Sequence, residues 1–210
     1  MSIPEILLAF AGHLLWPAAC PLCGALGVPA CLECLLPHLT PPLPEDLGPV
    51  KLWTGGPHEG LLRECALEMK YGGNRLLAHV MGRALGRIFP PPEADCLVPV
   101  PLHRGSTRTY NQSAALASGI AREWNLPVID GLLWKEERST QTALPEAQRR
   151  NMPPDALAAL SGKFTGKRAV LVDDVATTGT TLCRAASALE RGGAKVVLAL
   201  TWTHSPKASP

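Results

Sequence analysis

The chain has 210 residues, of which 46% are hydrophobic and 18% are charged. This composition excludes an intrinsically disordered protein, because such chains combine low hydrophobicity with a high net charge. The net charge is only +2, which argues against strong binding to nucleic acid. Residues 1–50 contain acidic side chains but no Lys or Arg. Any site for an anionic ligand is therefore expected after residue 50.

The first predicted element is an amphipathic helix over residues 3–16. Its apolar stretch, residues 6–15, is far shorter than the ~20 residues that span a bilayer. Glu5 precedes this stretch and no Lys or Arg does, which is not typical of a signal peptide. We therefore expect a cytoplasmic protein with no membrane span.

Two Cys-x-x-Cys pairs follow this helix, formed by Cys20, Cys23, Cys31 and Cys34. Four thiolates at this spacing can surround one Zn²⁺ tetrahedrally, and a site with four protein ligands is structural rather than catalytic. The alternatives are two redox dithiols or simply buried thiols, and no feature favours an iron–sulfur cluster. The odd total of seven cysteines favours metal binding in a reducing cytoplasm over a disulfide framework. The remaining cysteines are predicted to be small buried residues: Cys65, Cys96 and Cys183.

The chain divides into three predicted parts. Residues 1–36 form the N-terminal helix and zinc knuckle, residues 37–49 a linker, and residues 50–210 a second domain. Five prolines in residues 37–49 predict a stiff connection rather than a helix or a central strand.

Helical and strand patterns alternate after the linker. Helices are predicted over residues 61–69, 76–88, 112–124 and 180–191. Strands are predicted over residues 50–53 (an edge strand), 96–101, 128–129, 132–134, 168–173 and 195–201. Residues 136–154 are polar and weakly periodic, which predicts a long loop, and a short helix is expected between this loop and the 168–173 strand. The alternation indicates an α/β fold, with a mainly parallel sheet flanked by helices.

The most informative segment runs from Val170 to Leu182. A hydrophobic strand ends at two adjacent carboxylates, Asp173 and Asp174, and a loop rich in Thr and Gly leads into a helix. The loop backbone and the helix N-terminus can cradle a phosphate. Paired carboxylates instead suit the hydroxyls of a sugar or a bound Mg²⁺. The alternative is a solvated acidic strand end beside a capped helix, and a Walker A site is excluded because the chain has no Gly-Lys-Ser/Thr triplet.

This segment resembles the signature of type I phosphoribosyltransferases, which bind phosphoribosyl pyrophosphate (PRPP). The resemblance implies a phosphoribosyltransferase-like fold, in which the catalytic-site carboxylates of Asp173 and Asp174 hold the 2′- and 3′-hydroxyls of the ribose. It also implies that the following loop wraps the 5′-phosphate and that Mg²⁺ accompanies PRPP. This PRPP-binding loop comprises Ala176, Thr177, Thr178, Gly179, Thr180 and, at the helix start, Thr181.

Two basic segments are candidates for binding the pyrophosphate. The first follows the 96–101 strand and contains His103, Arg104 and Arg108, and the second is the predicted loop with Arg149 and Arg150. The charge of these residues suits an anion. By the same resemblance, the first segment binds pyrophosphate and the second is a flexible loop that closes over it. The alternatives are a solvated basic loop for the first and an ordinary surface loop for the second.

The order of motifs over residues 17–202 is similar to that of the bacterial ComF family, which includes GntX-type relatives. The motifs after the four cysteines are Met69-Lys-Tyr-Gly-Gly73, Val98-Pro-Val-Pro-Leu102, Tyr110-Asn-Gln112, Gln141-Thr-Ala-Leu144, Arg149-Arg-Asn151 and the Asp-Asp strand. The family usually shows Arg-Gly-Phe before Asn-Gln, where this chain has Arg108-Thr-Tyr110.

The ComF resemblance implies a PRPP-binding protein that acts in DNA uptake during natural competence. Such a protein either transfers a phosphoribosyl group to an unknown acceptor, or it is a non-catalytic sensor of PRPP or a nucleotide. A third hypothesis is a subunit of a DNA-import complex, in which the zinc knuckle docks a helicase-like competence protein and basic residues contact single-stranded DNA. Candidate DNA contacts are Arg75, Arg83, Arg87, Arg104 and Arg108. Strong DNA binding is not predicted, because no aromatic base-stacking platform is evident.

Overall fold

The computed structural model describes residues 19–103, 105–135 and 155–205. The predicted helix over residues 3–16, the predicted loop over residues 136–154 and Arg104 lie outside the described residues. Within the described residues, no helix has the length and hydropathy needed to cross a membrane.

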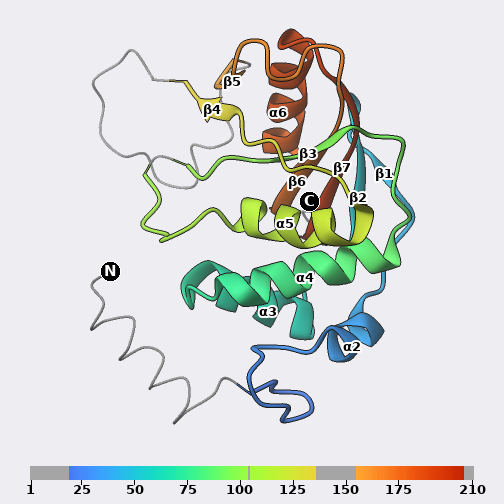
Figure 1. Ribbon diagram of the computed structural model, residues 1–210, viewed down its shortest axis with the longest axis vertical. Helices are drawn as coiled ribbons and strands as arrows, with labels where there is room; N and C mark the ends of the chain where they lie inside the picture. Colours follow the sequence, from blue (N-terminus) through green and yellow to red (C-terminus); the bar gives the residue numbers. More distant parts are fainter. Residues whose placement is uncertain (1–18, 104, 136–154, 206–210) are drawn as a thin grey trace, which may run out of the picture.

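A five-stranded sheet forms the centre of the molecule (Figure 1). Its strands in spatial order are β1 (Glu45–Asp46), β2 (Lys51–Thr54), β7 (Lys195–His204), β6 (Arg168–Ala176) and β3 (Cys96–Pro99). The pairs β2–β7, β7–β6 and β6–β3 are parallel, and only β1 is antiparallel to its neighbour. The prediction of a mainly parallel sheet is therefore confirmed.

Helices cover both faces of this sheet (Figure 1). One face carries α3 (Gly60–Tyr71), α4 (Arg75–Ile88) and α5 (Gln112–Trp124). The other face carries α6 (Thr180–Arg191) and a small antiparallel sheet of β4 (Leu132–Trp134) and β5 (Leu157–Ala159). The cysteine-rich segment ends in a short helix, α2 (Leu32–Leu35), followed by the 3-10 turn η1 (Leu36–His38).

Strand β6 separates two apolar cores. Val170 and Val172 face the core under α3, α4 and α5, whereas Ala169 and Leu171 face the core under α6. All four side chains are fully buried, as expected for a central parallel strand whose alternate side chains point to opposite faces. The strand that carries the Asp pair is therefore held from both sides.

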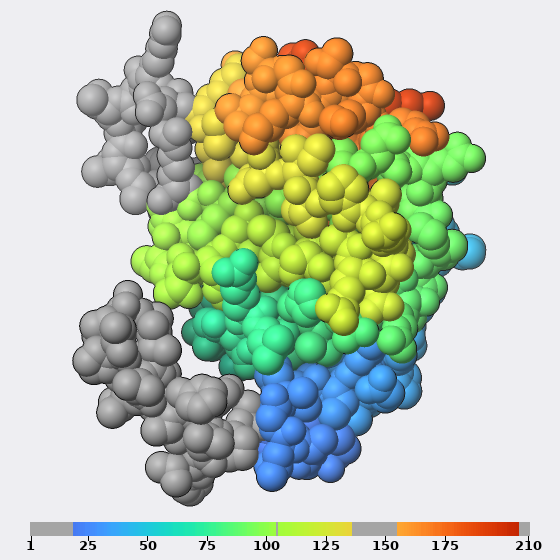
Figure 2. Space-filling view, in the orientation of Figure 1, coloured from blue at the N-terminus to red at the C-terminus, as the bar shows by residue number. Residues whose placement is uncertain are grey.

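The cysteine-rich segment packs at one end of the molecule, where Figure 2 shows it in blue beside the helical layer. Its buried side chains join the core of α3, α4 and α5 rather than forming a core of their own. These side chains are Ala30, Leu32, Leu35 and Leu39.

The structure corrects four details of the predicted elements. Strand β6 runs to Ala176, so the Asp pair lies within the strand instead of ending it. The segment before β6 contains strand β5 instead of a short helix, because Leu157–Ala159 pairs with β4. Strand β2 is not the edge strand, because β1 from the predicted linker pairs beside it. The predicted 128–129 strand is reduced to one bridge between Val128 and Leu97.

Candidate functional site

The loop between β6 and α6 forms a small hollow at the carboxyl edge of the sheet. Gly179 lies directly before α6 and has a φ of 69°, a left-handed conformation that favours glycine. The hydroxyls of Thr178 and Thr180 lie 2.8 Å apart in this loop. The hollow measures about 40 Å³ and is lined by Asp173 and by residues 175–182. The backbone N–H groups that open α6 have no partner within the helix, so this edge suits an anion.

Neighbouring segments brace this loop. The Leu47 side chain, from the turn between β1 and β2, lies so close to Gly179 that a Cβ there would sit 2.7 Å from its nearest methyl. His204, at the end of β7, lies 3.0 Å from the Glu45 carboxylate and 3.1 Å from the Thr177 carbonyl oxygen. The loop therefore keeps its shape through contacts with β1 and β7 as well as through its own backbone.

The two carboxylates of the Asp pair have different surroundings. The Asp173 carboxylate accepts a 2.8 Å hydrogen bond from the Ser113 hydroxyl and a 2.9 Å bond from the Asp174 backbone N–H. Burial, and then the adjacent Asp174 charge, raise the pKa of Asp173 to about 7. Asp174 is 8% exposed, and its Oδ1 accepts a 2.6 Å bond from the Val175 N–H. The hydrogen bonds hold both carboxylates in place.

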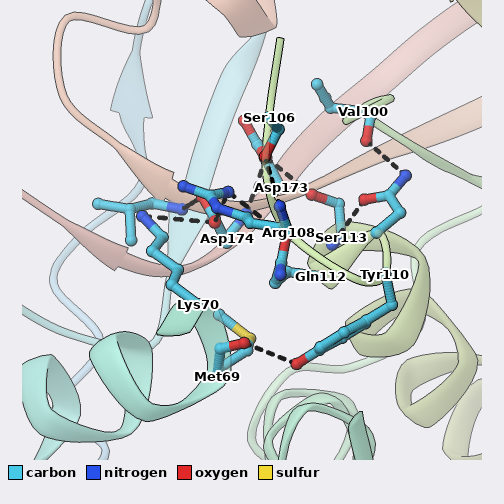
Figure 3. A network of polar contacts seen from close by, with 12 residues as sticks. Met69, Lys70, Val100, Ser106, Arg108, Tyr110, Gln112, Ser113, Asp173 and Asp174 are labelled. Carbon is cyan, nitrogen blue, oxygen red and sulfur yellow. Dashed lines mark hydrogen bonds and ion pairs between the residues drawn. The ribbon is translucent and has the colours of Figure 1, made fainter. Parts of the chain in front are cut away.

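Two cations lie against the second oxygen of Asp174 (Figure 3). The Lys70 Nζ, from the last turn of α3, is 3.3 Å from Asp174 Oδ2, and an Arg108 Nη1 is 3.5 Å from the same oxygen. The same Arg108 nitrogen donates a 3.4 Å bond to the buried Gln112 side-chain oxygen. Asp174 therefore shares one negative charge between two positive groups.

The N-terminus of α5 joins the site to the rest of the fold. Asn111 caps this helix by accepting a 3.1 Å bond from the Ser113 N–H, and its amide donates a 3.0 Å bond to the Val100 carbonyl. The Tyr110 hydroxyl donates a 2.7 Å bond to the Met69 carbonyl at the end of α3 (Figure 3). The segment 108–113 thus fixes Arg108 and Ser113 beside the Asp pair.

The four paired cysteines come together in a second cluster. Their sulfur atoms all lie within 4.8 Å of one another. Four sulfurs that each bond one Zn²⁺ at ~2.3 Å would be roughly 3.8 Å apart, so the cluster needs only a small contraction to surround the ion. The cluster can therefore hold a metal ion. Its ligands are Cys20, Cys23, Cys31 and Cys34.

The thiols of this cluster compete for protons. Burial alone would raise the pKa of the Cys20 thiol. Hydrogen bonds donated by the backbone N–H of Cys31 and by other backbone N–H groups nearby outweigh burial and lower the pKa to about 6. The hydrogen bond with the Cys23 sulfur, and then burial, raise the pKa of Cys31 to about 12. Without a cation, the four sulfurs therefore cannot all be thiolates near neutral pH. A divalent metal ion stabilises all four together.

Comparison with known proteins finds similarity over about half of the chain. Residues 111–209 match the family described as phosphoribosyl transferase domain. Competence protein F of Haemophilus influenzae is 33% identical over 111 residues, which are 50% of this chain and 48% of that protein. Residues 111–209 are thus similar to a phosphoribosyl transferase domain, and half of the chain is similar to competence protein F. The match spans about half the length of this curated relative.

Two solved structures resemble the chain at lower sequence identity. Glutamine PRPP amidotransferase from B. subtilis is 25% identical, with a TM-score of 0.48, and the match covers 65% of this chain and 30% of that one. Adenine phosphoribosyltransferase from Leishmania donovani is 13% identical, with a TM-score of 0.44 and coverage of 77% and 86%.

The structure brings together only part of the predicted anion-binding set of the chain. Arg108 contacts Asp174, as described. His103 is exposed, and its ring lies edge-on to Trp134 with 5.1 Å between the centroids. The other three predicted residues, Arg104, Arg149 and Arg150, lie outside the described residues.

Two residues of this site are not predicted from the sequence. Lys70 belongs to one of the quoted motifs without an assigned role, and Ser113 belongs to none. Each reaches the Asp pair through packing between elements far apart in the sequence: Lys70 and Asp174 are 104 positions apart, and Ser113 and Asp173 are 60 positions apart. Only the proximity of Ser113 to the Tyr110-Asn-Gln112 motif offered a signal.

Proposed function

We propose that this protein binds PRPP at the carboxyl edge of its sheet. The observation that carries the proposal is the pairing of two carboxylates with a braced Thr- and Gly-rich loop at the start of α6. Asp173 and Asp174 would accept hydrogen bonds from the ribose 2′- and 3′-hydroxyls. The loop residues 176–181 would bind the 5′-phosphate through backbone N–H and threonine hydroxyl groups.

Mg²⁺ is proposed to enter with PRPP rather than to occupy a separate protein site. Protein sites usually hold Mg²⁺ through one or two carboxylates together with substrate phosphates. The Asp pair supplies the carboxylates, and Asp174 already faces two cations that compete with a metal ion. The diphosphate of PRPP would supply the remaining oxygens. Arg108 contributes positive charge for the diphosphate, and the same role is proposed for His103, Arg104, Arg149 and Arg150.

Isothermal titration calorimetry with PRPP, with and without Mg²⁺, tests this proposal. We expect binding that requires Mg²⁺ and weakens at least about tenfold in Asp173→Asn and in Asp174→Asn, since each variant loses a carboxyl group that accepts a ribose hydroxyl. Asp155→Asn is the matched control, because this exposed carboxylate pairs with Lys135 away from the loop. Equal affinity in all four proteins, or no binding by folded, metal-loaded wild type, would overturn the proposal.

Phosphoribosyl transfer is a further step that binding alone does not establish. A transferase would release pyrophosphate when a nitrogen acceptor is added to the PRPP complex. A sensor of PRPP or of a nucleotide would bind without release. A coupled pyrophosphate assay with free bases and single-stranded DNA as acceptors separates the two functions.

We propose Zn²⁺ as the metal of the cysteine cluster, because four thiolates are a typical structural zinc set. A reducing cytoplasm would keep these thiols available. The metal content of the purified protein tests this assignment, with one Zn²⁺ per chain expected and less than half an equivalent contradicting it.

A role in DNA uptake is proposed from the similarity to competence protein F. A helicase-like partner of the cysteine module belongs to the same proposal. Direct DNA binding receives little support from two of the candidate arginines, because Arg83 and Arg87 both bind the Glu123 carboxylate, at 2.7 Å and 3.0 Å. An oligonucleotide titration at ~50 mM salt tests direct contact, and no binding there would exclude it.

A further inference from the structure

The surroundings of Asp174 carry more positive than negative charge. The Lys70 ammonium and the Arg108 guanidinium both contact one carboxylate oxygen, and their side chains are only 17% and 27% exposed. Asp173 offsets only part of this charge near neutral pH, because burial and the adjacent Asp174 raise the pKa of its carboxyl to about 7. A partly buried surplus of positive charge is unfavourable unless an anion balances it.

The position of Lys70 is fixed by packing and hydrogen bonding. The preceding residue, Met69, is fully buried in the core of α3, α4 and α5. Its carbonyl accepts the Tyr110 hydroxyl, and Tyr110 lies two residues from Arg108 (Figure 3). One hydrogen bond therefore ties together the two segments that carry the cations. The backbone at Lys70 is therefore held in place, which keeps its ammonium close to Asp174.

We propose that Lys70 is a ligand-binding residue that takes the diphosphate group of the bound ligand. The inference rests on the proposed function, PRPP binding, and adds a residue to it. In PRPP the 2-hydroxyl and the diphosphate are on adjacent carbons of the ribose. A cation that touches Asp174 therefore lies within reach of the diphosphate once Asp174 accepts a ribose hydroxyl. The 5′-phosphate is proposed to bind the loop before α6, so it does not need Lys70.

Ligand binding then exchanges one partner of Lys70 for another. Without ligand, Lys70 occupies the Asp174 oxygen that a ribose hydroxyl needs. With PRPP, the ammonium moves to the diphosphate and frees this oxygen. Lys70 thus favours ligands that carry the diphosphate and opposes ligands that carry only the sugar. The two kinds of ligand are therefore affected in opposite directions when Lys70 is removed. A lysine that only stabilised the fold would affect the affinity for both in the same direction.

Calorimetry on Lys70→Met with three ligands tests this prediction in the presence of Mg²⁺. We expect affinity for PRPP and for free pyrophosphate to fall about 10- to 100-fold, the loss typical of a charge-assisted hydrogen bond. Affinity for ribose 5-phosphate is expected to stay the same or to increase. Lys195→Met is the control, because this exposed lysine starts β7 at the opposite edge of the sheet.

Two results would overturn the inference. The first is an unchanged PRPP affinity in Lys70→Met, and the second is an equal loss for PRPP and ribose 5-phosphate. Lys70→Arg keeps the charge and is expected to retain PRPP binding within a few fold, which keeps the test valid where the methionine variant is unstable. Wild type that binds no PRPP refutes the proposed function itself. Wild type that binds PRPP as tightly as Lys70→Met refutes only the role of Lys70.

Tyr110 is a positioning residue in this arrangement, since it acts through the segment that holds Lys70. Tyr110→Phe removes the bond to the Met69 carbonyl and is expected to weaken PRPP binding a few fold. The same change in the Lys70→Met background is expected to have a smaller effect, because only the Arg108 segment can then transmit it. Additive effects in this double-mutant cycle would show that Tyr110 does not act through Lys70.

Discussion

The cysteine cluster and the loop before α6 are both prearranged, but different forces hold them. Cys20 is buried, whereas Cys23 is exposed and Cys31 is only half-buried. The apolar residues around them belong to the core of α3, α4 and α5. The loop, by contrast, joins a strand and a helix that are themselves buried. We therefore expect the first site to need a bound metal ion, whereas packing holds most of the second.

Removal of the metal is expected to have the largest effect and tests this difference most directly. Chelation removes the metal ion, and Cys34→Ser leaves the ion with only three thiolate ligands. We expect a loss of at least about 3 kcal/mol, or roughly 6–12 °C in Tm, because α2 contributes to the larger core. Thermal unfolding followed by circular dichroism measures this loss. PRPP affinity below the transition is expected to change little.

Cys183→Ser is the control for this prediction, since Cys183 lies in α6 outside the cluster. A chelated protein with an unchanged Tm would show that packing holds both regions. The cysteine cluster and the loop before α6 would then be held by the same force, and the four cysteines would be ordinary thiols.

Gly179→Ala tests whether packing forms the loop. The substitution places a side chain at a φ of 69° and brings a Cβ within 2.7 Å of a Leu47 methyl. We expect a loss of about 1–3 kcal/mol in stability and a PRPP affinity at least about tenfold weaker. Urea unfolding and calorimetry measure the two effects.

Gly166→Ala is the matched control, because Gly166 has a similar φ of 71° and no atom within 4 Å of the added Cβ. Gly166→Ala has only the cost of placing a side chain at a positive φ, without a steric clash, and Gly166 lies outside the loop between β6 and α6. Equal effects on PRPP binding in the two variants would show that the shape of the loop is not what binds the ligand.

The pH dependence of stability tests the burial of Asp173. Burial, and then Asp174, raise the pKa of this carboxyl from 3.8 to about 7 in the folded protein. The folded state therefore holds the proton more firmly than the unfolded state. The contribution of this group to stability falls as pH rises from about 4 to about 7 and is constant above that range.

Urea unfolding from pH 4 to pH 8 measures this contribution as the difference between wild type and Asp173→Asn. This difference in the free energy of unfolding is expected to fall as pH rises from about 4 to about 7. Asp155→Asn should show a nearly flat difference over this range, because the hydrogen bond to Lys135 lowers the pKa of Asp155 from 3.8, so that its contribution is lost only below about pH 4. A difference for Asp173 that is flat or rises with pH would contradict the prediction.

Local patterns were sufficient to predict the framework of the site. The bounds of α5 and α6 were predicted to the residue, since Asn111 caps the first helix and glycines end the second. Strand β5 was missed because Leu-Ala-Ala favours a helix, and only its pairing with β4 makes it a strand. Lys70 was missed for a similar reason, since its role comes from packing and not from its neighbours in sequence.

The Asp pair and its loop were predictable because one continuous segment contains both. Their partners were not, since Ser113 and Lys70 come from α5 and α3. The cysteine cluster is the opposite case, because its four ligands fall within 15 residues and the structure adds no further ligand from the described residues. A site is thus predictable from sequence to the extent that it is local.

The smallest effect is expected from Glu45→Gln, which probes the brace between β1 and the loop. The Glu45 side chain is 49% exposed, so its 3.0 Å contact with His204 contributes less than about 1 kcal/mol. His204 keeps its contact with the Thr177 carbonyl, so the loop should hold its shape and PRPP affinity should fall about twofold or less. His204→Ala removes both contacts and is expected to weaken PRPP binding further.

Glu190→Gln, an exposed change near the end of α6, is the control for both variants, measured by calorimetry and urea unfolding. If Glu45→Gln weakens PRPP binding as much as Gly179→Ala does, the loop depends on this charge rather than on packing against Leu47. Both binding regions would then owe their shape to an electrostatic contact at the surface, with a metal ion in one and an ion pair in the other.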